Sequence, residues 1–120
     1  MKVLVTGAAG FIGSHVTESL LAEGWEVIGV DNFDSFYDPA IKKENLKGVR
    51  RNKAFRLMEG DIRDGAFLES VASGSKLDAV IHLAARAGVR PSLEQPKLYT
   101  DVNVSGTVEV LEMAKRNKIP

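Results

Sequence analysis

The chain has no cysteine, which excludes disulfide bonds and thiolate metal sites, and we predict no metal site of another kind. The absence also fits a reducing compartment, so a cytoplasmic location is expected. No apolar run approaches the roughly 18 residues that a membrane helix needs. The apolar run at 3–5 is likewise too short for the core of a signal peptide.

Neither sign of charge dominates. Sixteen lysines and arginines balance sixteen aspartates and glutamates, so the overall charge indicates neither nucleic acid nor a membrane surface as a partner. The stretch 42–56 is an exception, with seven basic residues and one acid, Glu44. A solvated face is the simplest interpretation. Aromatic residues that could stack on bases are not interleaved with it.

The 120 residues suffice for one domain with one core, and short β-rich runs alternate with longer helical ones. We expect strands at 2–6, 26–31, 54–61 and 77–85, helices at 11–23, near 39–47, at 65–73 and at 97–117, and a loop at 86–96. Asp64 could cap the helix 65–73. Strands joined through helices are parallel. The fold class is therefore a doubly wound α/β sheet (Rossmann) in the order 3-2-1-4, with ligands at the carboxyl ends of strands near the switch between strands 1 and 4.

The predicted helix 97–117 carries two apolar stripes. One contains Val104, Val108 and Leu111, and the other contains Val102, Val110 and Met113. One stripe can pack on the sheet, whereas the other needs a further partner, either a second subunit or chain beyond Pro120. Ile119 and Pro120 resemble the approach to a fifth strand. We therefore expect truncation before strand 5, and a homodimer or other self-association through 97–117.

Three glycines follow the first strand in VTGAAGFIGSH, which spans residues 5–15. Gly7 permits a tight turn, Gly10 lacks a β-carbon that would collide with a pyrophosphate, and Gly13 lets the first helix pack closely on the strand. The helix N-terminus offers free N–H groups and partial positive charge to the anion. Taken alone, the spacing also fits a simple tight turn. A P-loop is excluded because no Gly-Lys-Ser/Thr follows.

Asp31 ends the second strand, 24 residues after Gly7. A carboxylate there can accept hydroxyls of an adenosine ribose and would repel a 2′-phosphate, which favours NAD over NADP. Two alternatives stay open. Asp31 could merely cap the following loop, and the basic stretch 42–56 could hold a 2′-phosphate if Asp31 turned away.

These motifs together resemble the N-terminal half of the extended short-chain dehydrogenase/reductase family, which includes NAD-dependent nucleotide-sugar epimerases and dehydratases. The matching segments are Thr6–Gly13, Asp31-Asn32, Asp61-Ile62, His82–Ala85 and the Asn103–Thr107 run, so the resemblance covers essentially the whole chain. It implies cofactor contacts by Gly7, Gly10, Phe11, Ile12, Gly13, Asp31, Asn32, Ser35, Asp61, Ile62, Leu83, Ala84, Ala85 and Asn103. Arg86 and Arg90 lie in the loop beyond strand 4, where the substrate would lie, and could contact UDP or a carboxylate there.

Structural roles compete with several of these assignments. Asn32 and Ser35 are also turn formers, and Asp61 could be a cap residue. Ala84 and Ala85 could simply be small strand residues, and Asn103 a structural hydrogen-bonding group. Arg86 and Arg90 could be solvated loop charges. For both histidines a structural role is favoured: His82 packed in the core, and His15 exposed on the first helix.

One part of the family pattern is missing. The resemblance implies catalysis by a Tyr-x-x-x-Lys dyad and an upstream Ser or Thr, but Tyr37 is followed four residues later by Ile41, and Tyr99 by Asn103. We therefore expect no catalytic residue here. Residues 1–120 are interpreted as the NAD-binding domain of a longer enzyme, inactive alone.

The segments 31–38 and 82–99 most resemble UDP-glucuronate 4-epimerases, with UDP-glucose 4-epimerases close by. The expected function is the NAD-binding part of a UDP-sugar C4 epimerase that acts by transient oxidation. A nucleotide-sugar substrate is the expected partner of the full enzyme. The alternatives are a stand-alone dinucleotide-binding or sensor module, and a sugar-nucleotide dehydratase or reductase of the same family.

Overall fold

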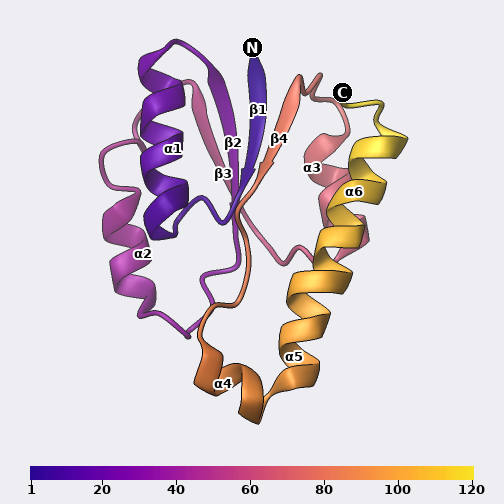
Figure 1. The fold of residues 1–120 in the computed structure, drawn as a ribbon. Coiled ribbons are helices and arrows are strands. Elements are labelled where there is room, and N and C mark those ends of the chain that lie inside the picture. The colour runs from indigo at the N-terminus through magenta and orange to yellow at the C-terminus, as the bar shows by residue number, and fades with distance from the viewer.

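The computed structural model describes all 120 residues, and its centre is a parallel sheet of four strands (Figure 1). The strands are β1 (Lys2–Thr6), β2 (Glu26–Asp31), β3 (Phe55–Glu59) and β4 (Ala79–His82), in the order β3-β2-β1-β4. The predicted fold class and strand order are therefore confirmed. Because the strands pair in parallel, all four carboxyl ends lie at the same end of the sheet.

Helices lie on both sides of the sheet (Figure 1). On one side are α1 (Phe11–Ala22) and α2 (Pro39–Asn45). On the other are α3 (Gly65–Ala72) and the C-terminal helical run, made of α5 (Pro96–Thr100), the π-helical turn η1 (Asp101–Ser105) and α6 (Gly106–Arg116). Alternate residues of the central strand supply the two cores, since Val3 and Val5 join one apolar cluster and Leu4 joins the other.

The expected strand at 77–85 and loop at 86–96 both need correction. β4 stops at His82. The N–H of Leu83 is shared between the carbonyl and hydroxyl oxygens of Thr6, both at 3.1 Å, and the N–H of Ala84 donates to the Thr6 hydroxyl oxygen at 3.2 Å. The expected loop contains a short helix, α4 (Val89–Glu94), which starts after Gly88 at a φ of 103°. That left-handed backbone is available at little cost only to glycine, and it redirects the chain into the helix.

Other boundaries are closer to expectation. α1 ends at Ala22 and β3 at Glu59, each one or two residues short of the expected end. Asp64 caps α3 as predicted, because its carboxylate accepts the N–H of Phe67 at 3.0 Å. The helical run that was expected at 97–117 starts at Pro96 and contains the π-helical turn, which its periodicity did not predict.

The two stripes of that helical run lie in different environments, as expected. Val110 and Met113 are buried against the sheet, at 3% and 1% exposure. Val104, Val108 and Leu111 remain open, at 58%, 51% and 62%. β4 forms an edge of the sheet, and its residues are only partly buried. None of the helices combines the length and the apolar composition that crossing a membrane would require.

Candidate functional site

A cavity of about 500 Å³ opens at the carboxyl ends of the strands, where the topology predicts a ligand. Most of the residues named from the sequence line it: Gly7, Gly10, Phe11, Ile12, Gly13, Asp31, Asn32, Asp61, Ile62, Leu83, Ala84, Ala85 and Arg86. Ser35, Asn103 and Arg90 do not. Ser35 and Arg90 are exposed, whereas Asn103 is partly buried behind the cavity wall.

The glycine turn brings three backbone segments into contact. Gly7 has a φ of 70°, and a β-carbon on it would lie 2.8 Å from the Ala84 nitrogen. A β-carbon on Gly13 would lie 2.0 Å from the Gly7 carbonyl oxygen. Gly13 therefore lets α1 pack on the turn itself, which corrects the expected contact with the strand. On Gly10 the only neighbour of a β-carbon would be the Gly7 oxygen, at 3.3 Å.

The N-terminus of α1 has unused hydrogen-bond donors. The backbone N–H groups of Phe11, Ile12 and Gly13 have no acceptor within the protein, and Gly10 provides no side-chain cap. The first turn also contains no acidic residue that could neutralise the helix dipole. These donors lie beside the cavity, so the site fits a diphosphate, which brings negative charge and oxygen acceptors to a helix N-terminus.

Asp31 lies at the cavity, but its carboxylate is already heavily engaged. One oxygen accepts the N–H of Ala9 at 3.0 Å, and the other accepts the N–H of Phe33 and the ammonium of Lys42, both at 2.9 Å. The side chains of Asp31 and Lys42 are only 4% and 12% exposed. A carboxylate has about four acceptor positions, so roughly one remains for a ligand hydroxyl. Lys42 retains free N–H donors beside it.

Asp61 is held as a carboxylate by Arg63. The guanidinium donates to both oxygens of Asp61, at 3.0 and 2.8 Å, and its other arm reaches Asp101 at 3.0 Å. The Asn32 amide also donates to Asp61, at 3.2 Å. Chiefly through the Arg63 hydrogen bonds, the pKa of Asp61 falls from its ordinary value of 3.8 to about 2. Asp61 is therefore an obligate acceptor at neutral pH.

Arg86 is fixed at both its backbone and its side chain. The Asn103 amide accepts the N–H of Arg86 at 2.8 Å and donates to its carbonyl oxygen at 3.0 Å. The guanidinium pairs with Asp34 at 3.0 Å and lies over the rings of Phe36 and Tyr99. The ion pair with Asp34 ties the segment after β4 to the segment after β2. Asn103 does not line the cavity itself, but it holds the backbone of Arg86, which does.

Sequence reasoning missed several residues of the site, including Lys42, Asn45 and Arg63. Lys42 belongs to the basic stretch that we interpreted as a solvated face, yet it alone of the seven basic side chains turns inward. The Asn45 amide donates to the Ala9 carbonyl oxygen at 3.0 Å. Lys42 and Asn45 could have been found from the position of the short helix α2, which follows Asp31 closely enough in the sequence to fold back over it.

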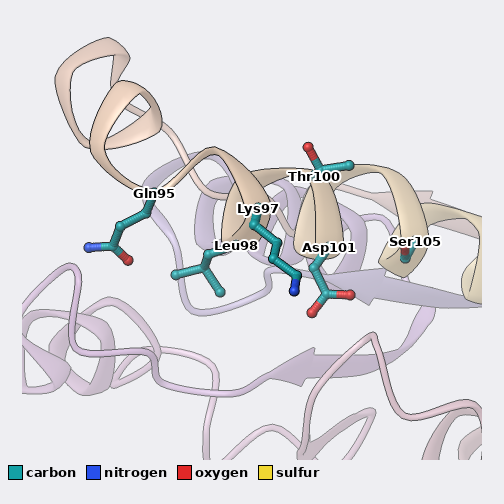
Figure 2. A pocket seen from close by; sticks show the side chains of 6 residues that line it. All are labelled: Gln95, Lys97, Leu98, Thr100, Asp101 and Ser105. Carbon is teal, nitrogen blue, oxygen red and sulfur yellow. The ribbon is translucent and has the colours of Figure 1, made fainter.

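A second, more open depression lies along α5 and η1, lined by Gln95, Lys97, Leu98, Thr100, Asp101 and Ser105 (Figure 2). In this view Lys97 and Asp101 project to one side of the helical run and Thr100 to the other. None of the residues named from the sequence as site residues lines it. The depression is therefore separate from the cavity at the strand ends.

Comparison with known proteins identifies the family of this arrangement. The family model described as GDP-mannose 4,6 dehydratase matches residues 4–120. The chain belongs to the GDP-mannose 4,6 dehydratase family. The expected relationship to NAD-dependent epimerases and dehydratases is thereby confirmed. The glycine turn, Asp31 and the Asp61-Ile62 pair all lie within the matched residues.

One curated protein with a similar sequence is a UDP-glucuronate 4-epimerase of Thermodesulfobacterium geofontis (strain OPF15). It is 46% identical over 112 residues, which cover 93% of this chain and 35% of the relative. The crystal structure of the UDP-glucuronic acid 4-epimerase from Bacillus cereus, in complex with UDP-glucuronic acid and NAD, has a TM-score of 0.87. It is 37% identical and covers 96% of this chain and 36% of its own.

A third similar protein is DesIV, a dTDP-glucose 4,6-dehydratase from Streptomyces venezuelae, whose crystal structure contains NAD and TYD. Its TM-score is 0.87 at 35% identity, over 99% of this chain and 37% of its own. The chain therefore spans about a third of the length of the relatives that it matches.

Proposed function

We propose that the chain is the NAD-binding part of a nucleotide-sugar 4-epimerase, with UDP-glucuronate as the substrate class. The observation that carries the proposal is the set of unsatisfied N–H groups of Phe11, Ile12 and Gly13, which face a cavity that also contains Asp31 and Asp61. The similarity to UDP-glucuronate 4-epimerases supports the choice of substrate.

The parts of the cavity suggest an orientation for the dinucleotide. The α1 N-terminus would hold the diphosphate, Asp31 and Lys42 the adenosine ribose, and Asp61 with Ile62 the adenine. Leu83, Ala84 and Ala85 would lie along the nicotinamide side, and Arg86 would face the sugar nucleotide. When bound there, NAD supplies a hydride acceptor for the sugar C4. The residues described here bind and orient.

The two tyrosines have surroundings other than those expected of a catalytic dyad. The hydroxyl of the buried Tyr99 donates to the Ala87 carbonyl oxygen at 2.8 Å, and Tyr37 is stacked edge-on against Phe36. We propose that the proton-transferring groups of the enzyme come from residues outside 1–120. A dehydratase acting on a related sugar nucleotide is the second candidate, and the likeness to DesIV favours it.

Calorimetry with NAD and NADP tests the cofactor proposal. The chain is expected to bind NAD in preference to NADP. Asp31→Ala should weaken NAD binding by about tenfold, because a ribose contact is lost, and should strengthen NADP binding, because Lys42 is left without its carboxylate beside the 2′ position. If the unsubstituted chain binds NAD and NADP equally well and Asp31→Ala changes neither affinity, the assignment of Asp31 to the ribose is excluded.

A matched pair of double variants separates the roles of neighbouring lysines. Asp31→Ala combined with Lys42→Ala should lose the gain in NADP binding. Asp31→Ala combined with Lys43→Ala should keep it, because Lys43 is exposed and has no hydrogen bond to Asp31. If both pairs behave alike, the charge of the whole basic stretch 42–56 and not Lys42 determines NADP binding.

We also propose that a second copy of the chain covers the open stripe of Val104, Val108 and Leu111, which gives a homodimer. The exposure of these three side chains and the free edge of β4 support this.

A cytoplasmic location remains a proposal, supported by the absence of cysteine.

A further inference from the structure

The imidazole of His82, at the end of β4, lies between two threonine hydroxyls. Its Nδ1 is 2.6 Å from the Oγ1 of Thr6, and its Nε2 is 3.0 Å from the Oγ1 of Thr107. Thr6 and His82 are register partners in neighbouring strands, whereas Thr107 comes from α6. None of the three lines the cavity, so any influence on a ligand must pass through other residues.

The proton positions in this chain follow from counting donors at Thr107. Its hydroxyl is 2.7 Å from the carbonyl oxygen of Asn103, which can only accept. The single proton of Thr107 is therefore used there, and its oxygen can only accept from His82. The Nε2 atom of His82 must carry the hydrogen.

Thr6 leads independently to the same tautomer. Its hydroxyl oxygen accepts the N–H of Ala84 at 3.2 Å and, at 3.1 Å, the N–H of Leu83, which it shares with the Thr6 carbonyl oxygen, so both lone pairs are occupied. The Thr6 hydroxyl therefore donates its proton to the Nδ1 of His82, and this nitrogen must carry no hydrogen of its own. Burial also lowers the pKa of His82, which keeps the ring neutral.

The chain of hydrogen bonds ends on the cavity wall at both sides. Leu83 and Ala84 line the cavity, and the Ala84 nitrogen touches the glycine turn where a β-carbon on Gly7 would lie 2.8 Å away. At the other end, the side chain of Asn103 brackets the backbone of Arg86. The segment 83–86 is thus held at one end by Thr6 and at the other by Asn103, and His82 links these two ends through Thr107.

We propose that His82 is a positioning residue, a neutral Nε2–H imidazole that ties Thr6 to Thr107 and so sets the segment 83–86 against the glycine turn. The inference rests on the proposed function, since this wall positions a cofactor only if NAD binds in the cavity.

The tautomer can be observed directly by long-range ¹H–¹⁵N NMR of the imidazole rings at neutral pH. The chain has only two histidines, and His15→Gln assigns them. His82 is expected as the Nε2–H form. His15 provides a contrast, because its Nδ1 is 2.7 Å from the Phe11 carbonyl oxygen and must donate when the ring is neutral. An Nδ1–H or doubly protonated His82 at neutral pH overturns the proposal.

Thr107→Val tests the positioning role without touching the cavity. It should shift the His82 tautomer signals and the amide signals of Leu83 and Ala84, and should weaken NAD binding about fivefold, the effect of one lost hydrogen bond. Thr107→Ser keeps the hydroxyl and should restore all three. The matched control is Thr100→Val, because the exposed Thr100 makes the same bond to a carbonyl four residues earlier, that of Pro96.

The readouts separate this proposal from the proposed function. Unchanged NAD affinity or unchanged Leu83 and Ala84 amides in Thr107→Val contradict the positioning role. If the unsubstituted chain does not bind NAD, the cofactor proposal fails, while the tautomer and the amide shifts still decide whether His82 sets the wall.

Discussion

Single residues at this site act mainly through charges and hydrogen bonds that join distant parts of the chain. Asp31 and Lys42 are 11 positions apart, and Arg63 and Asp101 are 38 apart. The acid at the end of the second strand predicted that Asp31 would lie at the site, and the family resemblance implied the same of Asp61. Neither predicted Lys42 or Arg63, because a charged side chain in an exposed segment has no periodic signature that reveals its partner.

Asp61 gives a pH prediction at this scale. Its pKa in the folded chain, about 2, lies below the ordinary 3.8, so ionised Asp61 contributes stability above about pH 4 that is lost as the pH falls toward 2. Arg63→Gln should remove this contribution. Urea unfolding should then show a difference in unfolding free energy between the unsubstituted chain and Arg63→Gln that shrinks over that range.

Arg56→Gln is the control, since this exposed arginine of β3 makes no hydrogen bond or ion pair through its side chain. The network around Asp61 is partly solvated, so added salt should reduce the effect. A difference that stays constant between pH 4 and 2 would show that Arg63 acts through packing and not through Asp61.

Elements meet at this site through backbone contacts that leave no room for side chains. The turn at Gly7, the first turn of α1 and the segment after β4 all touch one another. The glycine spacing in the sequence predicted such a close approach. It did not say which surfaces would meet, because that depends on how α1 is inclined over the sheet.

Gly13→Ala tests this contact. The new methyl group would lie 2.0 Å from the Gly7 carbonyl oxygen, so α1 must move and the chain should lose about 1–3 kcal/mol of unfolding free energy. Urea denaturation measures the loss. Gly48→Ala is the control, because its β-carbon would meet only the Glu18 carboxylate, at 3.5 Å, and should change stability by less than about 0.5 kcal/mol. Equal effects of the two substitutions would exclude the tight contact at Gly13.

At the scale of the whole molecule, the sheet is covered on both faces but the C-terminal helical run is covered on one side only (Figure 1). The open stripe and the β4 edge are apolar and partly exposed, which favours association. The helical spacing of the apolar residues in 97–117 predicted both stripes.

Leu111→Lys should therefore shift the chain toward monomer, as sedimentation velocity at tens of micromolar would measure. Leu93→Lys is the matched control, because Leu93 is also exposed, at 76%, but lies on α4 away from the stripe. A monomeric unsubstituted chain, or equal loss of association in both variants, would contradict the dimer through α6.

The sequence by itself determined the parallel sheet, the glycine turn and the two apolar stripes of the C-terminal helical run, because these depend on periodicity and on residues that permit special backbone geometry. The strand order followed from the doubly wound topology that this alternation of strands and helices favours. Only the tertiary structure decided that Lys42 faces Asp31, that Asn103 holds Arg86 and that one proton arrangement joins Thr6, His82 and Thr107. The physical reason is that hydrogen bonds and ion pairs need atoms within about 3 Å. Such distances between residues as far apart as Thr6 and His82 exist only once the sheet has formed.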